Sequence, residues 1–178
     1  MFPRSEVGVR RVFAVVATAA ALAADAAAAP PYGPLSARDA AALERARTGA
    51  ARRLEREECQ QVLSDFTDPK GRTIRANLES WQRTPSDYLR QVILFADGRT
   101  LKDCQKAAVL LVTSRGHVTV FVCPAGGSIP GSRFARYQVE HSTLAEMMVI
   151  HEMLHTLGLA ENPPTPFEIT DRVAARCR

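Results

Sequence analysis

Apolar side chains recur every three or four residues between positions 142 and 157, and Gly158 follows the last of them. That spacing is typical of a helix with one buried face. Ser142 and Thr143 can cap the start of such a helix, and a glycine commonly ends one. The apolar face comprises Leu144, Met147, Met148, Ile150, Met153, Leu154 and Leu157. The pattern therefore predicts a half-buried helix that stops at Gly158.

Helix signals also occur nearer the N-terminus. The stretch from 37 to about 63 is rich in Ala, Leu, Glu and Arg, and Ser36 with Asp39 approximates a capping box before it. Because its charged residues most simply form a solvated face, the part from 36 to 55 is predicted to be a loosely attached helix. Trp81 is expected to lie in the core. Shorter helices are predicted at 74–81, 85–94 and 166–176.

The hydrophobic period changes in the middle of the chain. Residues 107–113 and 118–123 are short apolar, β-branched runs on either side of 114–117, which predicts a hairpin. Residues 91–95 are an alternative third strand, and 124–142 are expected to be irregular apart from a short turn near Arg133. Strands and helices thus fall in separate blocks, so we expect an α+β domain with a small, mainly antiparallel sheet.

The first 29 of the 178 residues have the composition of a signal peptide. Arg4, Arg10 and Arg11 form a basic start, residues 12–24 are apolar but too short to span a bilayer, and small residues follow. We therefore predict a signal peptide at 1–29, a linker at 30–35 and a single domain at 36–178. The protein is expected to be exported, to the periplasm or the extracellular space, without stable membrane association after cleavage.

Charge excludes one class of partner. Removal of residues 1–29 takes away three arginines and two acids, which lowers the formal net charge from +4 to +3. The remaining arginines are scattered and aromatic residues are few, so neither a phosphate-binding stripe nor a base-stacking surface is visible. Nucleic acid is therefore not an expected partner.

Four cysteines remain in the predicted mature chain, an even number in an oxidising compartment. Two disulfides are expected, and sequence alone permits three pairings. Cys104 and Cys123 flank the predicted hairpin, which favours a bond between them and leaves Cys59 to pair with Cys177. A cysteine zinc site is not favoured, because the chain has no Cys-x-x-Cys pair.

The predicted helix at 142–157 carries a candidate metal site. His151 and His155 are four residues apart, so both imidazoles can reach one ion, and Glu152 lies beside them to activate a water molecule. This pattern is the signature of a zinc peptidase. A catalytic Zn²⁺ has three protein ligands, and the downstream candidates for the third are Glu161 and Glu168.

The motif His151-Glu152-x-x-His155-x-x-Gly158-x-x-Glu161 resembles the elongated motif of the metzincin metallopeptidases, within the zincins. That resemblance implies a zincin-like fold with a central metal helix and flanking helices, with Glu161 as third ligand. The chain departs from the family because no methionine follows Met153 to form the methionine turn. The gluzincins instead take a glutamate from a later helix, which keeps Glu168 open. The stretch from 161 to 170 is also similar to a group of bacterial secreted proteins.

The resemblance implies a secreted zinc metallopeptidase that cleaves polypeptides with zinc-activated water and Glu152 as general base. Zincins bind extended substrates along an edge strand, for which residues 118–122 are the candidate here. Tyr137 and His141 are further candidates for stabilising the oxyanion, although structural or surface roles are favoured for both. The alternative function is a non-catalytic exported module with a structural or vestigial metal site.

Overall fold

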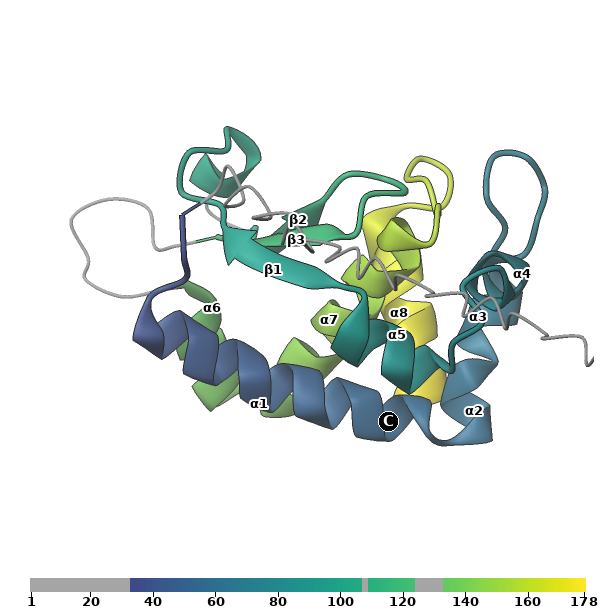
Figure 1. Cartoon of the computed structure of the whole chain (residues 1–178), viewed down its shortest axis with the longest axis horizontal. Coiled ribbons are helices and arrows are strands. Elements are labelled where there is room, and N and C mark those ends of the chain that lie inside the picture. The colour runs from purple at the N-terminus through teal and green to yellow at the C-terminus, as the bar shows by residue number, and fades with distance from the viewer. Residues whose placement is uncertain (1–32, 107–108, 124–132) are drawn as a thin grey trace, which may run out of the picture. The chain divides into compact units, whose positions relative to one another are not determined.

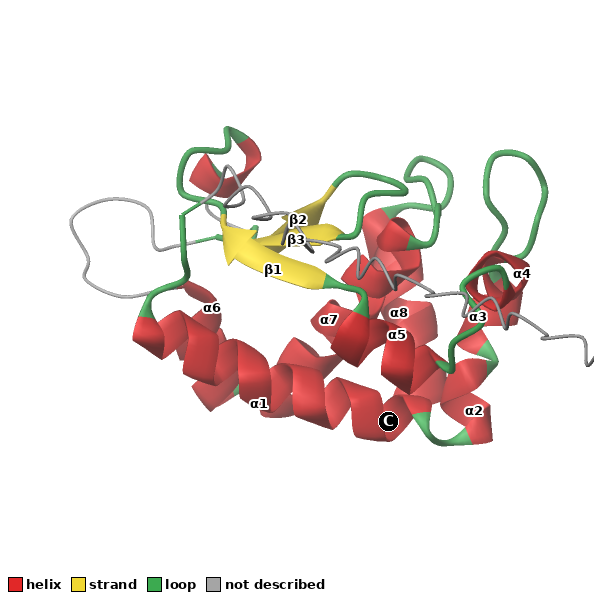
Figure 2. Ribbon diagram, in the orientation of Figure 1, coloured by secondary structure: helices red, strands yellow, loops and turns green. Residues whose placement is uncertain are grey.

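The computed structural model of the protein describes residues 33–106, 109–123 and 133–178. The predicted signal peptide and the first part of the predicted linker lie outside these residues. Within them, helices combine with a small three-stranded sheet, so the domain has the predicted α+β class (Figure 2). In chain order the elements are α1 (Ala37–Leu54), α2 (Glu57–Gln60), α3 (Val62–Asp65), α4 (Ile74–Glu79), α5 (Pro85–Gln91), β1 (Leu94–Asp97), η1 (Asp103–Gln105), β2 (Leu111–Thr113), β3 (Thr119–Val122), α6 (Arg133–Glu140), α7 (Ser142–Thr156) and α8 (Pro166–Cys177).

Helix α1 packs against α5, α6 and α7 along its length (Figure 1). Ser36 caps it, since its hydroxyl accepts a hydrogen bond from the Asp39 N–H at 3.1 Å. One face is fully buried, so the prediction of a loosely attached helix at 36–55 is wrong. The buried residues are mostly alanines, and their small side chains let the neighbouring helices approach closely. They are Ala42, Leu43, Ala46, Ala50, Ala51 and Leu54.

Helix α7 approaches α1 closely at Gly49. A Cβ atom at this position would collide with the side chain of Glu146 on α7. Glu146 is itself held by Arg53 of α1, with 2.5 Å between Oε2 and Nε. The glycine in the middle of α1 therefore leaves room for a side chain of α7.

The sheet has the strand order β1-β3-β2 and is mixed rather than mainly antiparallel. β2 and β3 form the predicted antiparallel hairpin, with Val112 opposite Phe121. β1 pairs in parallel with the other side of β3, with Phe95 opposite Val120. Parallel pairing arises because the chain passes through η1 and β2 between these two strands. β3 is therefore the central strand and has a neighbour along each edge.

Two further expectations are corrected by long-range packing. The short turn predicted near Arg133 is an eight-residue helix, α6, whose Phe134 and Ala135 are buried against the core. Trp81, predicted to be a core residue, is 46% exposed at the end of α4 and packs edge-on against Tyr88, with ring centroids 5.5 Å apart. Buried Tyr88 takes the core position in its place.

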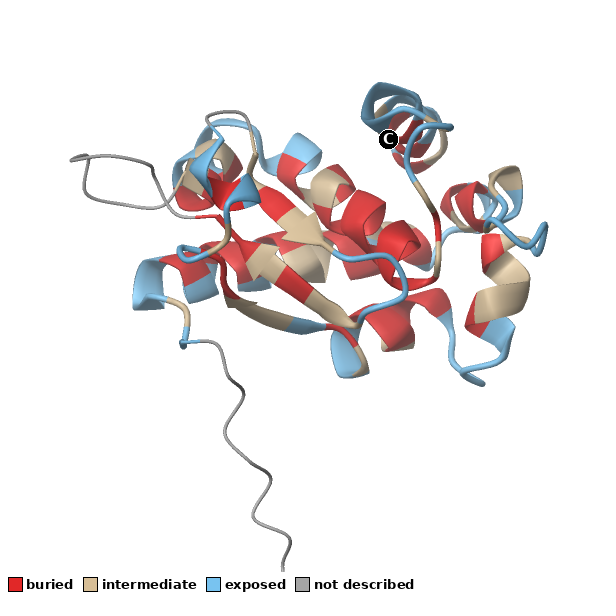
Figure 3. Cartoon of the chain, turned by 90° about the horizontal axis from the view of Figure 1, so that it is seen from above, coloured by how far each residue is buried: buried red, intermediate tan, exposed pale blue. Residues whose placement is uncertain are grey.

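The burial of side chains is concentrated on α7 and the elements around it, whereas the connecting loops are largely exposed (Figure 3). From Val149 to Thr156 every residue of α7 is buried. A helix surrounded in this way shields its polar side chains from water, and His151, Glu152 and His155 are among them. None of the described helices is long and apolar enough to cross a membrane.

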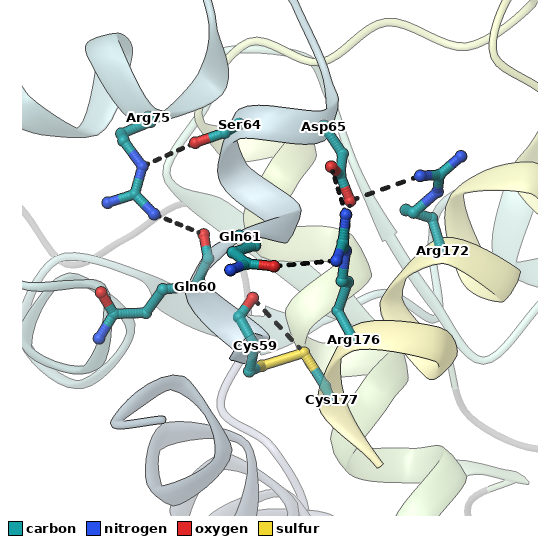
Figure 4. Close-up of polar contacts among 9 residues, drawn as sticks. All are labelled: Cys59, Gln60, Gln61, Ser64, Asp65, Arg75, Arg172, Arg176 and Cys177. Atoms are coloured by element: carbon teal, nitrogen blue, oxygen red, sulfur yellow. Dashed lines mark hydrogen bonds and ion pairs between the residues drawn. A yellow bond between two sulfur atoms is a disulfide. The ribbon is translucent and has the colours of Figure 1, made fainter. Parts of the chain in front are cut away.

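Both predicted disulfides are present. Cys59 on α2 is joined to Cys177 at the end of α8, and Cys104 is joined to Cys123 beside the hairpin. Figure 4 shows that polar contacts surround the first bond: Arg176 of α8 donates to Asp65 at 2.9 and 3.1 Å. Two disulfides indicate an oxidising, exported environment. The disulfide thus joins α8 to α2, and the ion pair between Arg176 and Asp65 joins α8 to α3.

Loop length predicts different contributions of the two disulfides to stability. On the chain-entropy model, replacing Cys59 and Cys177 with alanine, which opens a closure of 118 residues, lowers the free energy of unfolding by about 4 to 5 kcal/mol. The same change at Cys104 and Cys123, separated by 19 residues, costs about 3 kcal/mol. Urea unfolding of the two variants measures both values. If both variants lost the same free energy of unfolding, or if the variant without Cys104 and Cys123 lost more, loop length would not be the cause of the difference.

Candidate metal centre

Helix α7 places the two histidine side chains of the motif side by side. His151 and His155 are one turn apart and project from the same face. Their Nε2 atoms are 3.0 Å apart, and the rings meet edge to face with centroids separated by 4.9 Å. Both residues are buried, and the rings are in direct contact. The predicted histidine pair therefore forms within the core.

Gly158 ends α7 and reverses the chain, as the sequence predicts. Its φ of +105° lies in the region that favours glycine, and the Leu159 N–H returns to the Leu154 carbonyl at 3.1 Å. The chain then brings Glu161 back over the histidines. Glu161 Oε1 lies 3.2 Å from His155 Nε2 and 4.0 Å from His151 Nε2.

A second support holds the end of α7. The Asn77 side-chain amide donates to the Leu157 carbonyl and to Asp68 Oδ2, each at 3.0 Å. One side chain of α4 therefore joins the last turn of the metal-site helix to the turn that contains Asp68. This link fixes the point from which the loop bearing Glu161 departs.

Hydrogen bonds on the far side of each ring determine which nitrogen carries a proton. His155 Nδ1 lies 2.9 Å from the Leu159 carbonyl, which only accepts, so Nδ1 must be the donor. His151 Nδ1 lies 3.0 Å from Thr170 Oγ1, and the hydroxyl hydrogen of Thr170 is already donated to the Pro166 carbonyl. His151 Nδ1 is therefore a donor as well. Both Nε2 atoms are then left as lone-pair acceptors that face one another.

Three acceptor atoms thus converge without a donor between them: two imidazole nitrogens and a carboxylate oxygen, all within 4.8 Å of one another. Buried acceptors at such distances repel unless a cation lies among them. Burial is the main reason why the pKa of His151 is lowered to about 3, and the neighbouring His155 contributes to this shift, so at neutral pH the His151 imidazole has the neutral form that binds metals. The group of His151, His155 and Glu161 could therefore hold a metal ion.

Glu168, the alternative third ligand, has another role in the structure. Its carboxylate accepts the N–H of Thr165 at 2.7 Å, while the Thr165 hydroxyl accepts the N–H of Glu168 at 3.3 Å. This reciprocal arrangement is a capping box at the start of α8. The structure brings Glu161, rather than Glu168, beside the histidines.

Glu152 is buried beside the same face of α7, with 5% of its surface exposed. Burial is the main reason why its pKa is raised to about 8, and the nearby charge of Glu161 raises it further. A hydrogen bond from the backbone of Thr113, at the end of β2, acts in the opposite direction. The predicted general base is thus a buried carboxyl group that is able to exchange a proton near neutral pH.

The remaining candidates lie elsewhere. His141 comes directly before α7. It is ten residues from His151, which corresponds to about 15 Å at the rise of an α-helix. The ring of His141 contacts Tyr137 on α6. The expected start of α7 is also corrected, because His141 takes the cap position and no side chain of Ser142 or Thr143 caps the helix. Neither Tyr137 nor His141 is brought to the histidine pair.

Sequence reasoning did not single out the groups that orient the histidines. Thr170 lies 19 residues after His151 on a different helix, and the Leu159 group is a backbone carbonyl. No local pattern connects either of them to the motif. They become visible only when α8 is packed against α7.

The identity of the third ligand is testable with a matched pair of variants. We expect Glu161→Gln to weaken zinc binding by at least about tenfold, because a ligand charge is lost, whereas Glu168→Gln keeps the affinity of the unaltered protein. Isothermal titration of zinc into chelator-treated protein measures both. Weaker binding in Glu168→Gln with unchanged binding in Glu161→Gln would assign the ligand to Glu168 instead.

The raised pKa of Glu152 predicts how stability of the metal-free protein depends on pH. A group whose pKa rises from 4.5 to about 8 on folding stabilises the protein fully below pH 4.5, and this contribution is lost as the pH rises through 8. Glu152→Gln removes this pH-dependent loss, so between pH 4.5 and pH 8 the variant is expected to gain on the order of 4 kcal/mol in free energy of unfolding relative to the unaltered protein. Denaturant unfolding in EDTA between pH 4.5 and 8 measures the difference. A constant difference across that range would contradict a perturbed carboxyl group.

Comparisons of the chain with known protein families, curated proteins and solved structures found no match. The assignment of a candidate metal centre is therefore based on the arrangement of its own side chains. Two imidazoles on α7 and a carboxylate on the following loop supply the ligand atoms, and Thr170 with Leu159 orients the rings.

Proposed function

We propose that the chain is an exported zinc metallopeptidase, periplasmic or extracellular, that hydrolyses peptide bonds in polypeptides. The observation that carries the proposal is the convergence of three acceptor atoms without a donor, beside the buried carboxyl group of Glu152. A cation satisfies the acceptors, and a proton-exchanging carboxyl group next to it is the second requirement of hydrolysis. The motif supports the same function through its resemblance to metzincins.

Zinc is the favoured ion because the donor set contains two neutral imidazoles and one carboxylate. Structural zinc sites are usually closed by four protein ligands, whereas catalytic sites use three and leave a position open. Here the third side chain, Glu161, is 42% exposed, so the group of ligands borders on solvent. A zinc ion held by these residues supplies Lewis-acid chemistry, which polarises a carbonyl group and lowers the pKa of water.

Glu152 carries the proton transfers. Its carboxylate removes a proton from the attacking water and later passes that proton to the leaving amine. The hydrogen bond from the Thr113 backbone fixes the position of the carboxyl group between α7 and the end of β2. Burial keeps bulk water from competing for the proton.

The shape of the sheet indicates where an extended substrate would bind. The predicted strand, β3, is central and cannot accept another strand, whereas β2 is an edge strand of the described sheet. Cys123 donates to the Leu110 carbonyl, so in the alternating antiparallel pattern the N–H groups of Leu111 and Thr113 point away from β3. The Thr113 N–H donates to Glu152, which leaves the N–H of Leu111 for pairing with a substrate. A polypeptide paired with this edge would run toward Glu152, which supports β2 as the substrate-binding strand.

One substitution separates a peptidase from a non-catalytic module with the same metal. Glu152→Gln keeps all three ligands but removes the base, so peptide hydrolysis is expected to fall by roughly 10²- to 10⁴-fold with unchanged zinc content. Cleavage of internally quenched peptides and metal analysis of the purified protein measure the two quantities. Glu79→Gln, at an exposed position on α4, is the matched control and should retain activity. Equal hydrolysis by Glu152→Gln and the unaltered protein would contradict the role of Glu152.

A further inference from the structure

A hollow of about 490 Å³ lies beside the loop that carries Glu161. It is bounded by the turn that follows α3, by the loop between α7 and α8, and by the first turns of α8. Its lining residues are Asp65, Phe66, Thr67, Asp68, Pro69, Ala160, Pro163, Pro164, Glu168 and Arg172. Neither the metal ligands nor Glu152 line it.

The hollow adjoins the candidate metal centre through a shared wall. Ala160 and Pro163 lie one and two residues from Glu161, and consecutive Cα atoms are about 3.8 Å apart. Successive residues of an extended peptide are separated by about 3.3 Å. A side chain near the bond to be cleaved could therefore reach the hollow while the peptide backbone lies at the metal centre.

The charges that line the hollow do not cancel. Asp65 is compensated by Arg176, at 2.9 Å, and by Arg172, at 3.7 Å (Figure 4). Among the described residues, no lysine or arginine side-chain nitrogen forms an ion pair within 4.0 Å of Asp68 or Glu168. Two carboxylates thus line the hollow without an ion pair to a lysine or arginine side chain, although the charge of Arg72 acts on Asp68 from a greater distance.

Both carboxylates are held in place and ionised. Asp68 accepts the Asn77 amide and the backbone N–H groups of Arg72 and Lys70, and these bonds lower its pKa. The capping box with Thr165 lowers the pKa of Glu168 in the same way. On an open surface these two acids would be an ordinary turn and an ordinary helix cap. Here they lie at the sides of a concavity.

The rest of the lining is apolar. Phe66, Pro69 and Ala160 contribute hydrocarbon surface, as do the adjacent Pro163 and Pro164. A concave site with apolar walls and fixed negative charge matches a side chain with a long hydrocarbon stem and a cationic end, which describes lysine and arginine. An acidic side chain would be repelled by Asp68 and Glu168, and the one cationic lining residue, Arg172, lies 3.7 Å from Asp65.

We propose that this hollow is a specificity pocket that binds a lysine or arginine side chain of the polypeptide substrate. The inference rests on the proposed peptidase function, to which it adds the class of substrate. Glu168 and Asp68 attract the cationic end, and the proline-rich loop next to Glu161 packs against the stem. The pocket thereby selects peptides with a basic residue at one fixed distance from the cleaved bond.

The test uses internally quenched peptides that differ at one position only, with lysine, norleucine or glutamate. Norleucine keeps the hydrocarbon stem of lysine and removes the charge. Glu168→Gln is the first variant, because glutamine at this position retains the capping box while the charge is lost. Asp68→Asn is the second, and Glu79→Gln again controls for the loss of an exposed negative charge that does not line the hollow. Zinc content and thermal unfolding are measured for each protein.

At one peptide position, the zinc-loaded protein is expected to cleave the lysine peptide at least tenfold faster than the norleucine peptide, as kcat/KM. Glu168→Gln should reduce this ratio by at least threefold, Asp68→Asn should reduce it too, and Glu79→Gln should not. The ratio should also fall as salt is added, because part of the attraction is electrostatic. A protein that cleaves all three peptides equally well at every position would overturn the pocket while the peptidase function stands.

If the protein cleaves none of the peptides, the proposed peptidase function is contradicted. The specificity pocket is then tested by peptide binding alone. The lysine and norleucine peptides are labelled and titrated into zinc-loaded Glu152→Gln protein, and fluorescence anisotropy gives the Kd of each. Tighter binding of the lysine peptide that Glu168→Gln abolishes supports the pocket. Equal binding of both peptides, or a preference that survives Glu168→Gln together with Asp68→Asn, overturns it.

Discussion

Three acceptor atoms that point at one another without a proton between them are the constraint on which this structure depends. His151 and His155 each donate from Nδ1 to a fixed partner, so neither ring can turn to offer a hydrogen to the other or to Glu161. Without a cation the arrangement would cost free energy in proportion to its burial. The packing around α7, the reversal at Gly158 and the position of α8 are the features that make it persist.

The supports of this centre come from parts of the chain that are distant in sequence. Helix α8 supplies Thr170, and α8 is held by the disulfide to Cys59 and by the ion pairs of Asp65. Helix α1 holds the other side of α7 through an alanine-rich face and the contact at Gly49. The disulfide therefore bears on chemistry as well as stability, because it fixes the helix that orients a ligand.

Features that are local in sequence could be predicted, and features that arise from packing could not. The period of α7, the stop at Gly158, the spacing of the histidines and the two disulfides follow from neighbouring residues or from hairpin geometry. The parallel pairing of β1 depends on a connection that periodicity does not reveal. Alanine gives a weak signal of burial, so the sequence does not reveal the packed face of α1. The size of Trp81 favours a core position, but the structure buries Tyr88 and leaves Trp81 46% exposed. Thr170 could not be found because nothing local relates it to His151.

The amide of Asn77 has a consequence for how substrates would be chosen. It binds Asp68, which lines the hollow, and the Leu157 carbonyl, from which the loop to Glu161 departs. The Asn77 amide group therefore fixes the distance between the hollow, where a substrate side chain would bind, and the candidate metal centre, where the peptide bond would be cleaved. In the proposed peptidase, this amide would make cleavage depend on the number of residues between a basic side chain and the cleaved bond. A peptide that contains a basic residue at another position would not be cleaved.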